Sequence, residues 1–149
     1  MPFRLALLLC LSLAGLLPAC SRDAPPSGAA PTAALPPFDG DGRIGWQGML
    51  ACADCDGIDT TLALSRSGER REYLLVETYL AQDGDARFVE QGRWRQQGDA
   101  LIRLQAADGG ERVYALQADG RLQPRDGHGR RFARREGDFL TPMTASNGL

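Results

Sequence analysis

A regular succession of short apolar segments, each followed by a glycine-containing turn, is the feature that most constrains this fold. Apolar and polar residues alternate within the segments, which is typical of β-strands, and no 3.6-residue periodicity indicates a competing amphipathic helix. Consecutive strands joined by tight turns form hairpins without long crossovers, which favours a small antiparallel up-and-down β-barrel over a sandwich. We therefore predict an all-β protein with about eight strands, at residues 44–50, 58–64, 72–80, 88–95, 100–105, 111–117, 121–124 and 130–133.

The first residues of the chain carry the pattern of an exported lipoprotein. Arg4 precedes an apolar run that ends at Leu17 and is short for a membrane span, so residues 1–19 are predicted to be a signal peptide. The run leads into Leu-Pro-Ala-Cys, which resembles the lipobox of bacterial lipoproteins, whose cysteine is acylated after cleavage. We expect Cys20 to carry the lipid anchor; the alternative is an ordinary signal with an incidental cysteine. Ser21 resembles the residue found in lipoproteins of the outer membrane, so the expected location is the bacterial outer membrane, facing the periplasm.

Composition divides the rest of the chain into a tether, a domain and a tail. Residues 20–41 are dominated by Pro, Ala, Gly and Ser, and they bury too little apolar surface to fold, so we expect a disordered tether behind the lipid anchor. Residues 42–140 hold all of the predicted strands, and a domain of about 100 residues buries enough surface to be stable without obligatory disulfides. Residues 141–149 are expected to be a flexible tail.

The charge of the chain and its few catalytic side chains argue against two classes of function. A formal net charge of −2 is too acidic for a general nucleic-acid binder, and an exported protein meets no genome. The single histidine, His128, lies between two glycines, and no two carboxylates stand in a recognisable acid–base arrangement. We therefore expect neither a nucleic-acid partner nor an enzyme.

Cys52 and Cys55 are the two cysteines of the predicted domain, in a Cys-x-x-Cys pattern. One interpretation is a disulfide, which the periplasm favours, although closing so short a ring stabilises by only about 2 kcal/mol in the chain-entropy model. A second interpretation is a redox-active pair, but the neighbouring Asp54, Asp56 and Asp59 would disfavour the reactive thiolate. The surrounding segments also lack the βαβ pattern of a thioredoxin-like protein.

A site for a soft metal is the third interpretation. Two thiolates, with the Met49 thioether three residues before Cys52, suit Cu(I) far better than Ca²⁺ or Mg²⁺. A structural zinc site would need four ligands, and His128 is distant in the sequence. We therefore name Cys52, Cys55 and Met49 as candidate Cu(I) ligands and leave the disulfide and redox interpretations of the two cysteines open.

The segment around the cysteines resembles a known family. Residues 45–64 read Gly-Trp-Gln-Gly-Met-Leu-Ala-Cys-Ala-Asp-Cys-Asp-Gly-Ile-Asp-Thr-Thr-Leu-Ala-Leu, and this run is similar to the NlpE-type outer-membrane lipoproteins. The resemblance continues through residues 77–80 and 88–94 and into the later strands, so it covers nearly the whole predicted domain. Ala51 stands where that family usually has proline, and the second, OB-like domain of longer members is expected to be missing.

The resemblance implies a fold, a site and a role. It implies a lipocalin-like barrel, an anchor at Cys20 and a functional pair at Cys52 and Cys55. It also implies a sensor or accessory role in copper homeostasis and envelope stress, read by a signalling partner at the membrane. The alternative is a barrel that carries an apolar or lipid ligand, with a merely structural disulfide. A carrier needs an open interior, so a core packed with Trp94, Phe88, Leu62 and Leu64 would oppose that alternative.

Two further features concern charge. Glu90 shares a strand face with Phe88 and Trp94, so an inward-facing Glu90 would need a cationic partner, for which Arg103 is our candidate. Four arginines near the end of the domain are interpreted as a solvated face, with contact to anionic lipid or to a partner as the alternative. They are Arg130, Arg131, Arg134 and Arg135.

Overall fold

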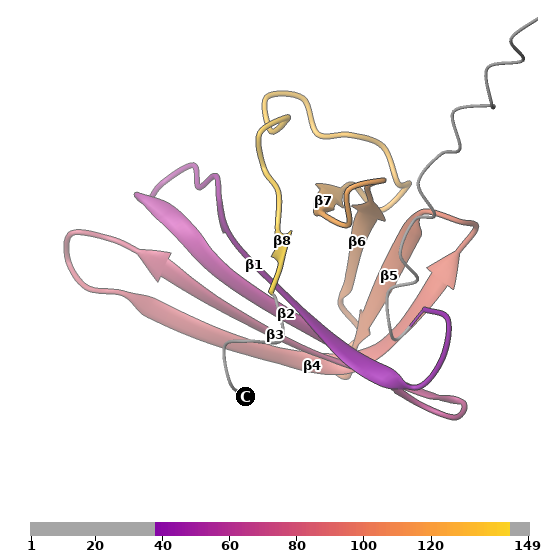
Figure 1. Cartoon of the computed structure of the whole chain (residues 1–149). Helices are drawn as coiled ribbons and strands as arrows, with labels where there is room; N and C mark the ends of the chain where they lie inside the picture. The colour runs from indigo at the N-terminus through magenta and orange to yellow at the C-terminus, as the bar shows by residue number, and fades with distance from the viewer. Residues whose placement is uncertain (1–37, 144–149) are drawn as a thin grey trace, which may run out of the picture. The chain divides into compact units, whose positions relative to one another are not determined.

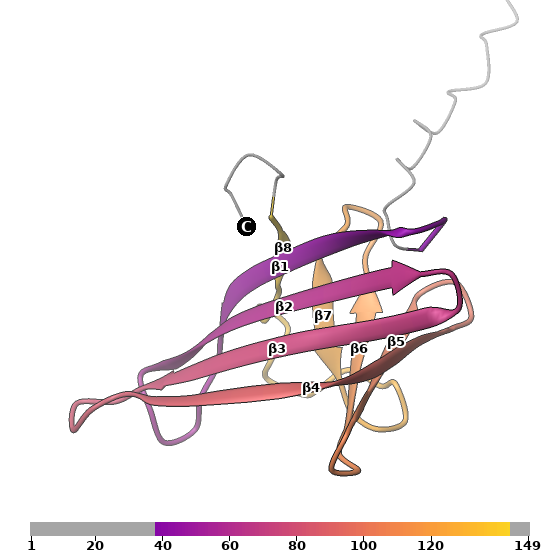
Figure 2. The ribbon, with the colours of Figure 1, turned by 90° about the horizontal axis from the view of Figure 1, so that it is seen from below.

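The computed structural model describes residues 38–143, which form one antiparallel sheet that curls into a nearly closed barrel (Figure 1). Its eight strands are β1 (Gly42–Leu50), β2 (Gly57–Ser67), β3 (Arg70–Leu80), β4 (Ala86–Gln97), β5 (Leu101–Ala106), β6 (Glu111–Leu116), β7 (Leu122–Arg125) and β8 (Thr141–Pro142). The strand order is β7-β6-β5-β4-β3-β2-β1-β8, and Figure 2 shows the first four strands side by side. The prediction of an all-β up-and-down barrel with eight strands is confirmed.

Several predictions concern residues outside the described range. They are the signal peptide at residues 1–19, the lipid anchor at Cys20, most of the tether and the end of the tail. Within residues 38–143, no helix is long and apolar enough to cross a membrane.

Alternate strand residues point inward and fill the closed part of the barrel. Leu62 lies opposite Trp46, and Leu64 lies opposite Tyr73; all four side chains are buried. Burial of a large apolar side chain contributes about 1.5–3 kcal/mol, so this core is the main source of stability. The indole Nε1 of Trp46 donates a 2.8 Å hydrogen bond to the carbonyl oxygen of Gly120 in the β6–β7 turn. The core therefore joins the first strand to the opposite wall.

The prediction of a last strand at residues 130–133 is wrong. Residues 130–133 hold only a single β-bridge, between Arg131 and Arg125. The eighth strand is instead β8, which lies within the segment predicted to be a flexible tail and pairs with the middle of β1. A two-residue strand has no apolar alternation of its own. Its position is set by the strands on either side of it, which a local pattern does not reveal.

Residues 138–143, which we call the closing segment, join the two edges of the sheet. Leu140 exchanges two backbone hydrogen bonds with Leu122 of β7, at 2.8 and 2.9 Å. The backbone N–H of Met143 donates to the carbonyl oxygen of Gly45 on β1, at 2.8 Å. The closing segment thus satisfies backbone groups on both edges that would otherwise stay unpaired.

β4 bends at Gly92 and separates a closed part of the barrel from an open one. β4 pairs with β3 from Ala86 to Arg93 and with β5 from Gly92 to Gln97, so the two pairings overlap only at Gly92 and Arg93. A Cβ atom on Gly92 would collide with the carbonyl oxygen of Gln105 and lie 3.0 Å from the Cα atom of Ala106. The close approach of β5 therefore requires glycine at this position.

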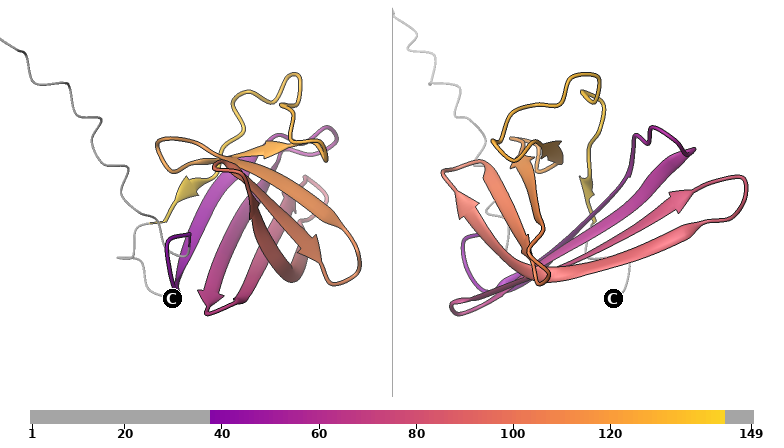
Figure 3. Two further views of the ribbon diagram at one scale, coloured as in Figure 1. Left: turned by 90° about the vertical axis from the view of Figure 1, so that its right-hand side faces the viewer. Right: turned by 180° about the vertical axis from the view of Figure 1, so that it is seen from behind.

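The β3–β4 hairpin extends beyond β5 and forms the open end of the barrel (Figure 3). Phe88 lies there and is 57% exposed, whereas Trp94, Leu62 and Leu64 are buried, so the packed core that would oppose a ligand carrier does not include Phe88. Phe88 packs edge-on against Tyr79, with ring centroids 5.3 Å apart. Alternation indicates which face a side chain occupies but not whether another strand lies opposite that face.

Replacing Gly92 with alanine tests the bend. We expect Gly92→Ala to lower the free energy of unfolding by about 1–3 kcal/mol, because the neighbour it meets is backbone that moves only with the whole of β5. Urea unfolding followed by tryptophan fluorescence measures the change. Gly127→Ala is the matched control, since its Cβ meets no atom within 4 Å, and a similar loss in both variants would contradict the proposed role of the close approach.

Candidate functional site

Cys52 and Cys55 lie in the loop between β1 and β2, where a disulfide joins them with their Cα atoms 5.4 Å apart. Both are partly buried and pack against the edge of the hydrophobic core. The backbone N–H of Asp56 donates a 2.8 Å hydrogen bond to the carbonyl oxygen of Leu80, at the end of β3. The loop therefore lies beside the β3–β4 hairpin at the open end of the barrel, as Figure 1 shows.

Met49, the third candidate ligand, lies apart from the core. Its side chain is more than half exposed, and its Sδ atom lies over Gly57, 2.7 Å from where a Cβ on that glycine would stand. Among the described residues, no group of three or more His, Cys, Asp and Glu side chains is arranged to hold a metal ion. Any metal chemistry at the loop thus depends on sulfur ligands, two of which become thiolates only when the disulfide is reduced.

The residue before the disulfide is held by an ion pair from the far end of the domain. The backbone N–H of Ala51 donates to both carboxylate oxygens of Asp138, at 3.2 and 3.3 Å, and the carbonyl oxygen of Ala51 accepts from Arg135 at 3.4 Å. Arg135 Nε lies 2.6 Å from Asp138 Oδ2, and the Asp138 side chain is almost fully buried. We call this arrangement the Ala51 clamp. It connects the disulfide loop to the first residue of the closing segment.

The clamp corrects the interpretation of the arginine cluster for Arg135 alone, because Arg130, Arg131 and Arg134 are exposed, as expected for a solvated face. Arg135 is only partly exposed, and its guanidinium lies 5.4 Å from the centre of the Phe132 ring as well as beside Asp138. Arg134, immediately before it, has a φ angle of 69°, a conformation that arginine rarely adopts. Sequence reasoning missed Asp138 altogether. Asp138 lies three residues after Arg135, which is visible in the sequence. Both residues contact Ala51, however, and Ala51 is more than 80 residues earlier in the chain, so no local pattern predicts this contact.

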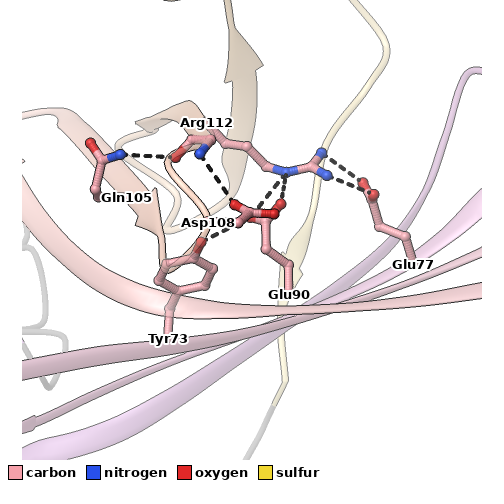
Figure 4. Close-up of polar contacts among 7 residues, drawn as sticks. Tyr73, Glu77, Glu90, Gln105, Asp108 and Arg112 are labelled. Atoms are coloured by element: carbon pink, nitrogen blue, oxygen red, sulfur yellow. Dashed lines mark hydrogen bonds and ion pairs between the residues drawn. The ribbon is translucent and has the colours of Figure 1, made fainter.

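A second polar cluster crosses the interior between β6 and the β3–β4 hairpin (Figure 4). Arg112 forms a bidentate ion pair with Glu77, at 3.1 and 3.2 Å, and its Nε atom lies 3.2 Å from both carboxylate oxygens of Glu90. The hydroxyl of Tyr73 donates to Glu90 at 2.9 Å. Burial and then this hydrogen bond raise the pKa of Tyr73. Burial alone would lower the pKa of Arg112, but the charge of Glu77 and other neighbours outweighs it and raises that pKa.

Arg112, and not Arg103, is therefore the partner of Glu90. On β5, Leu104 faces the core, so Arg103 points to the opposite face, where it pairs with Glu111 at 3.2 Å. Arg112 lies directly opposite Leu104 in the β5–β6 register and shares its inward face. The register of neighbouring strands decides which arginine meets Glu90, and it was not known from the sequence.

These features define a class: a small antiparallel β-barrel that carries a Cys-x-x-Cys disulfide on a loop at its open end. The sequence-family model of the NlpE N-terminal domain matches residues 46–134 of this chain. Since the match covers more than half of the chain, the protein belongs to the NlpE family through that domain.

Two comparisons with Escherichia coli proteins agree with this assignment. Lipoprotein NlpE of strain K12 is 35% identical over 75 residues, which cover 50% of this chain and 30% of the relative. The crystal structure of the Cpx pathway activator NlpE superimposes with a TM-score of 0.52 at 29% identity, covering 62% of this chain and 46% of that one. The chain thus spans less than half of the length of both relatives.

The Ala51 clamp predicts a local effect of Asp138→Asn. The amide retains shape but loses the charge that holds Arg135, so we expect a loss of about 1–3 kcal/mol in stability and faster hydrogen exchange at the Ala51 amide. Asp119→Asn is the control, because Asp119 forms an ion pair with Arg121 at the surface, far from the loop in sequence. Equal exchange of the Ala51 amide in the two variants would show that Asp138 does not hold the loop.

The interior cluster predicts a loss of stability in Arg112→Met. Glu77 is nearly fully buried, so removing its counter-charge should cost about 3–5 kcal/mol at neutral pH. Urea unfolding at pH 7 measures this loss. The double variant Arg112→Met/Glu77→Leu should recover much of it, and a deficit that does not depend on Glu77 would contradict the account.

Proposed function

We propose that this protein is a cell-envelope lipoprotein that senses copper load or thiol oxidation through the Cys52–Cys55 loop. Membership of the NlpE family supports a lipoprotein, and the predicted anchor at Cys20 supports a location in the outer membrane, facing the periplasm. The similar Escherichia coli protein is described as an activator of the Cpx pathway. We accordingly propose a role in envelope-stress signalling and copper homeostasis, without enzymatic activity.

The chemistry of the loop has two states. In the oxidised state, Cys52 and Cys55 form the disulfide, which suits an oxidising compartment. A dithiol reductant would transfer two electrons and two protons to the S–S bond, giving two thiols and leaving the reductant as a disulfide. Cys52 and Cys55 would then hold Cu(I) as thiolates, and their two protons would pass to the solvent. Met49 is the candidate third ligand, since it is accessible and lies beside the loop.

The position of the loop suggests how a partner would read this change. Ala51 precedes Cys52 and is bound on both backbone groups by the Ala51 clamp. A rearrangement of the loop on reduction or metal binding would strain or release that clamp. It would thereby act on the closing segment, which completes the barrel through Leu140. A membrane-associated signalling protein that binds the open end would distinguish the two states. The observation that carries the proposal is this connection between the disulfide loop and barrel closure.

Competitive titration tests the copper step. The reduced protein is titrated with Cu(I) against a chelator of known affinity, alongside Cys52→Ser/Cys55→Ser and Met49→Leu. We expect the double serine variant to lose more than about 100-fold in affinity, because even outer-shell changes at metal sites cost about 10–100-fold. Met49→Leu should show a smaller loss.

Circular dichroism confirms that each variant remains folded. Equal Cu(I) affinity in wild type and the double serine variant would remove the copper proposal. The redox proposal is tested separately, by comparing hydrogen exchange at Ala51 in oxidised and reduced wild-type protein. Identical exchange in the two states would show that the loop does not signal to the clamp.

A further inference from the structure

A recessed cavity of about 380 Å³ lies between the end of the β1–β2 hairpin, the start of β6 and the chain after β7. Its apolar lining includes Leu50, Ile58, Tyr79, Tyr114 and Phe132. This volume lies at the low end of the range of about 300–1,000 Å³ that is usual for small-molecule sites. The cavity therefore has the size and the walls for a small ligand with an apolar body.

The acidic side chains that line this cavity already have cationic partners. Glu77 pairs with Arg112 at 3.1 Å, and Asp126 pairs with Arg130 at 2.9 Å. Glu111, the third acidic lining residue, pairs with an arginine of β5 at 3.2 Å. No carboxylate of the lining is thus left to attract a cation.

Arg125, at the end of β7, lines the same cavity and forms no ion pair within residues 38–143. Its Nε atom is buried and is the one buried side-chain nitrogen or oxygen in that range without a hydrogen-bond partner. Arg131 lies directly opposite it in an isolated β-bridge, so a second cation is close. Burial, followed by the charge of Arg131, lowers the pKa of Arg125.

The other guanidinium groups of the lining are occupied. Arg112 is bound by two carboxylates, and Arg135 is bound by Asp138. A buried donor without an acceptor is costly, and a charged one more so, unless an anion satisfies it. Among the guanidinium groups of the lining, Arg125 is therefore the one that an incoming anion would satisfy.

We propose that this cavity binds a small amphipathic anion, with one carboxylate or phosphate head on Arg125 and a short apolar body against the aromatic walls. A bare inorganic anion would leave the apolar walls unused, and a neutral apolar molecule would leave Arg125 unsatisfied. The site is separate from the sulfur atoms of the loop, and the proposal does not depend on the sensing role. It also specifies a ligand for the alternative function, in which the barrel carries a small apolar or lipid molecule.

Binding is tested with sodium octanoate as the probe, alongside octanol and inorganic phosphate. The side-chain Nε–H resonance of Arg125 reports the contact in two-dimensional nitrogen–proton spectra of the purified protein. We expect octanoate to shift this resonance saturably and to bind at least about tenfold more tightly than octanol, the difference expected for one charge-assisted hydrogen bond. Inorganic phosphate should bind more weakly than octanoate.

Arg125→Gln should weaken octanoate binding by about tenfold or more and leave octanol binding nearly unchanged. Arg70→Gln is the matched control, because Arg70 is exposed on β3 and does not line the cavity. Unchanged octanoate affinity in Arg125→Gln would overturn the proposal. Equal affinity of wild type for octanoate and octanol, or no saturable octanoate binding at millimolar concentration, would overturn it without any variant.

Discussion

The pair of backbone hydrogen bonds between Leu122 and Leu140 holds the two edges of the sheet together. Without the closing segment, β1 and β7 would be open sheet edges with rows of unpaired backbone groups, onto which other chains can pair and aggregate. The closing segment covers both edges at once, because it bonds to β7 through Leu140 and to β1 through β8. Its first residue, Asp138, also holds the backbone of Ala51. Closure of the barrel and order in the disulfide loop therefore depend on the same short stretch of chain.

The barrel is packed at one end and open at the other. Before Gly92, β4 has no pairing with β5, and within residues 38–143 no other strand covers the inward face of the β3–β4 hairpin, so Phe88 is exposed there. Arg112 stands at the boundary, where its ion pairs with Glu77 and Glu90 span the interior. A charged cluster in this place resists complete apolar packing of the open end. It also leaves polar and apolar surfaces side by side, which is the setting of a ligand site more than of a structural core.

The disulfide lies where its chemistry can affect the rest of the domain. A ring closed by two cysteines so near in sequence contributes little to stability in the chain-entropy model, so its value lies in its position. The loop touches the core through both cysteines, the β3 end through Asp56 and the closing segment through Ala51. A change at the sulfur atoms would therefore meet several elements of the barrel through direct contacts. These contacts support the sensing role that we propose.

The sequence by itself determined the all-β class, the order of the first seven strands and the Cys-x-x-Cys spacing of Cys52 and Cys55, because period-two alternation, turn glycines and residue chemistry are local properties. It did not determine where β8 lies, whether Phe88 is covered, or which arginine meets Glu90. Nor did it reveal that Asp138 holds Ala51. Each of these depends on how strands distant in sequence align and on where the sheet closes. Only the tertiary structure decides those matters, because registers and closure are set by packing energies summed over the whole barrel, which no local segment contains.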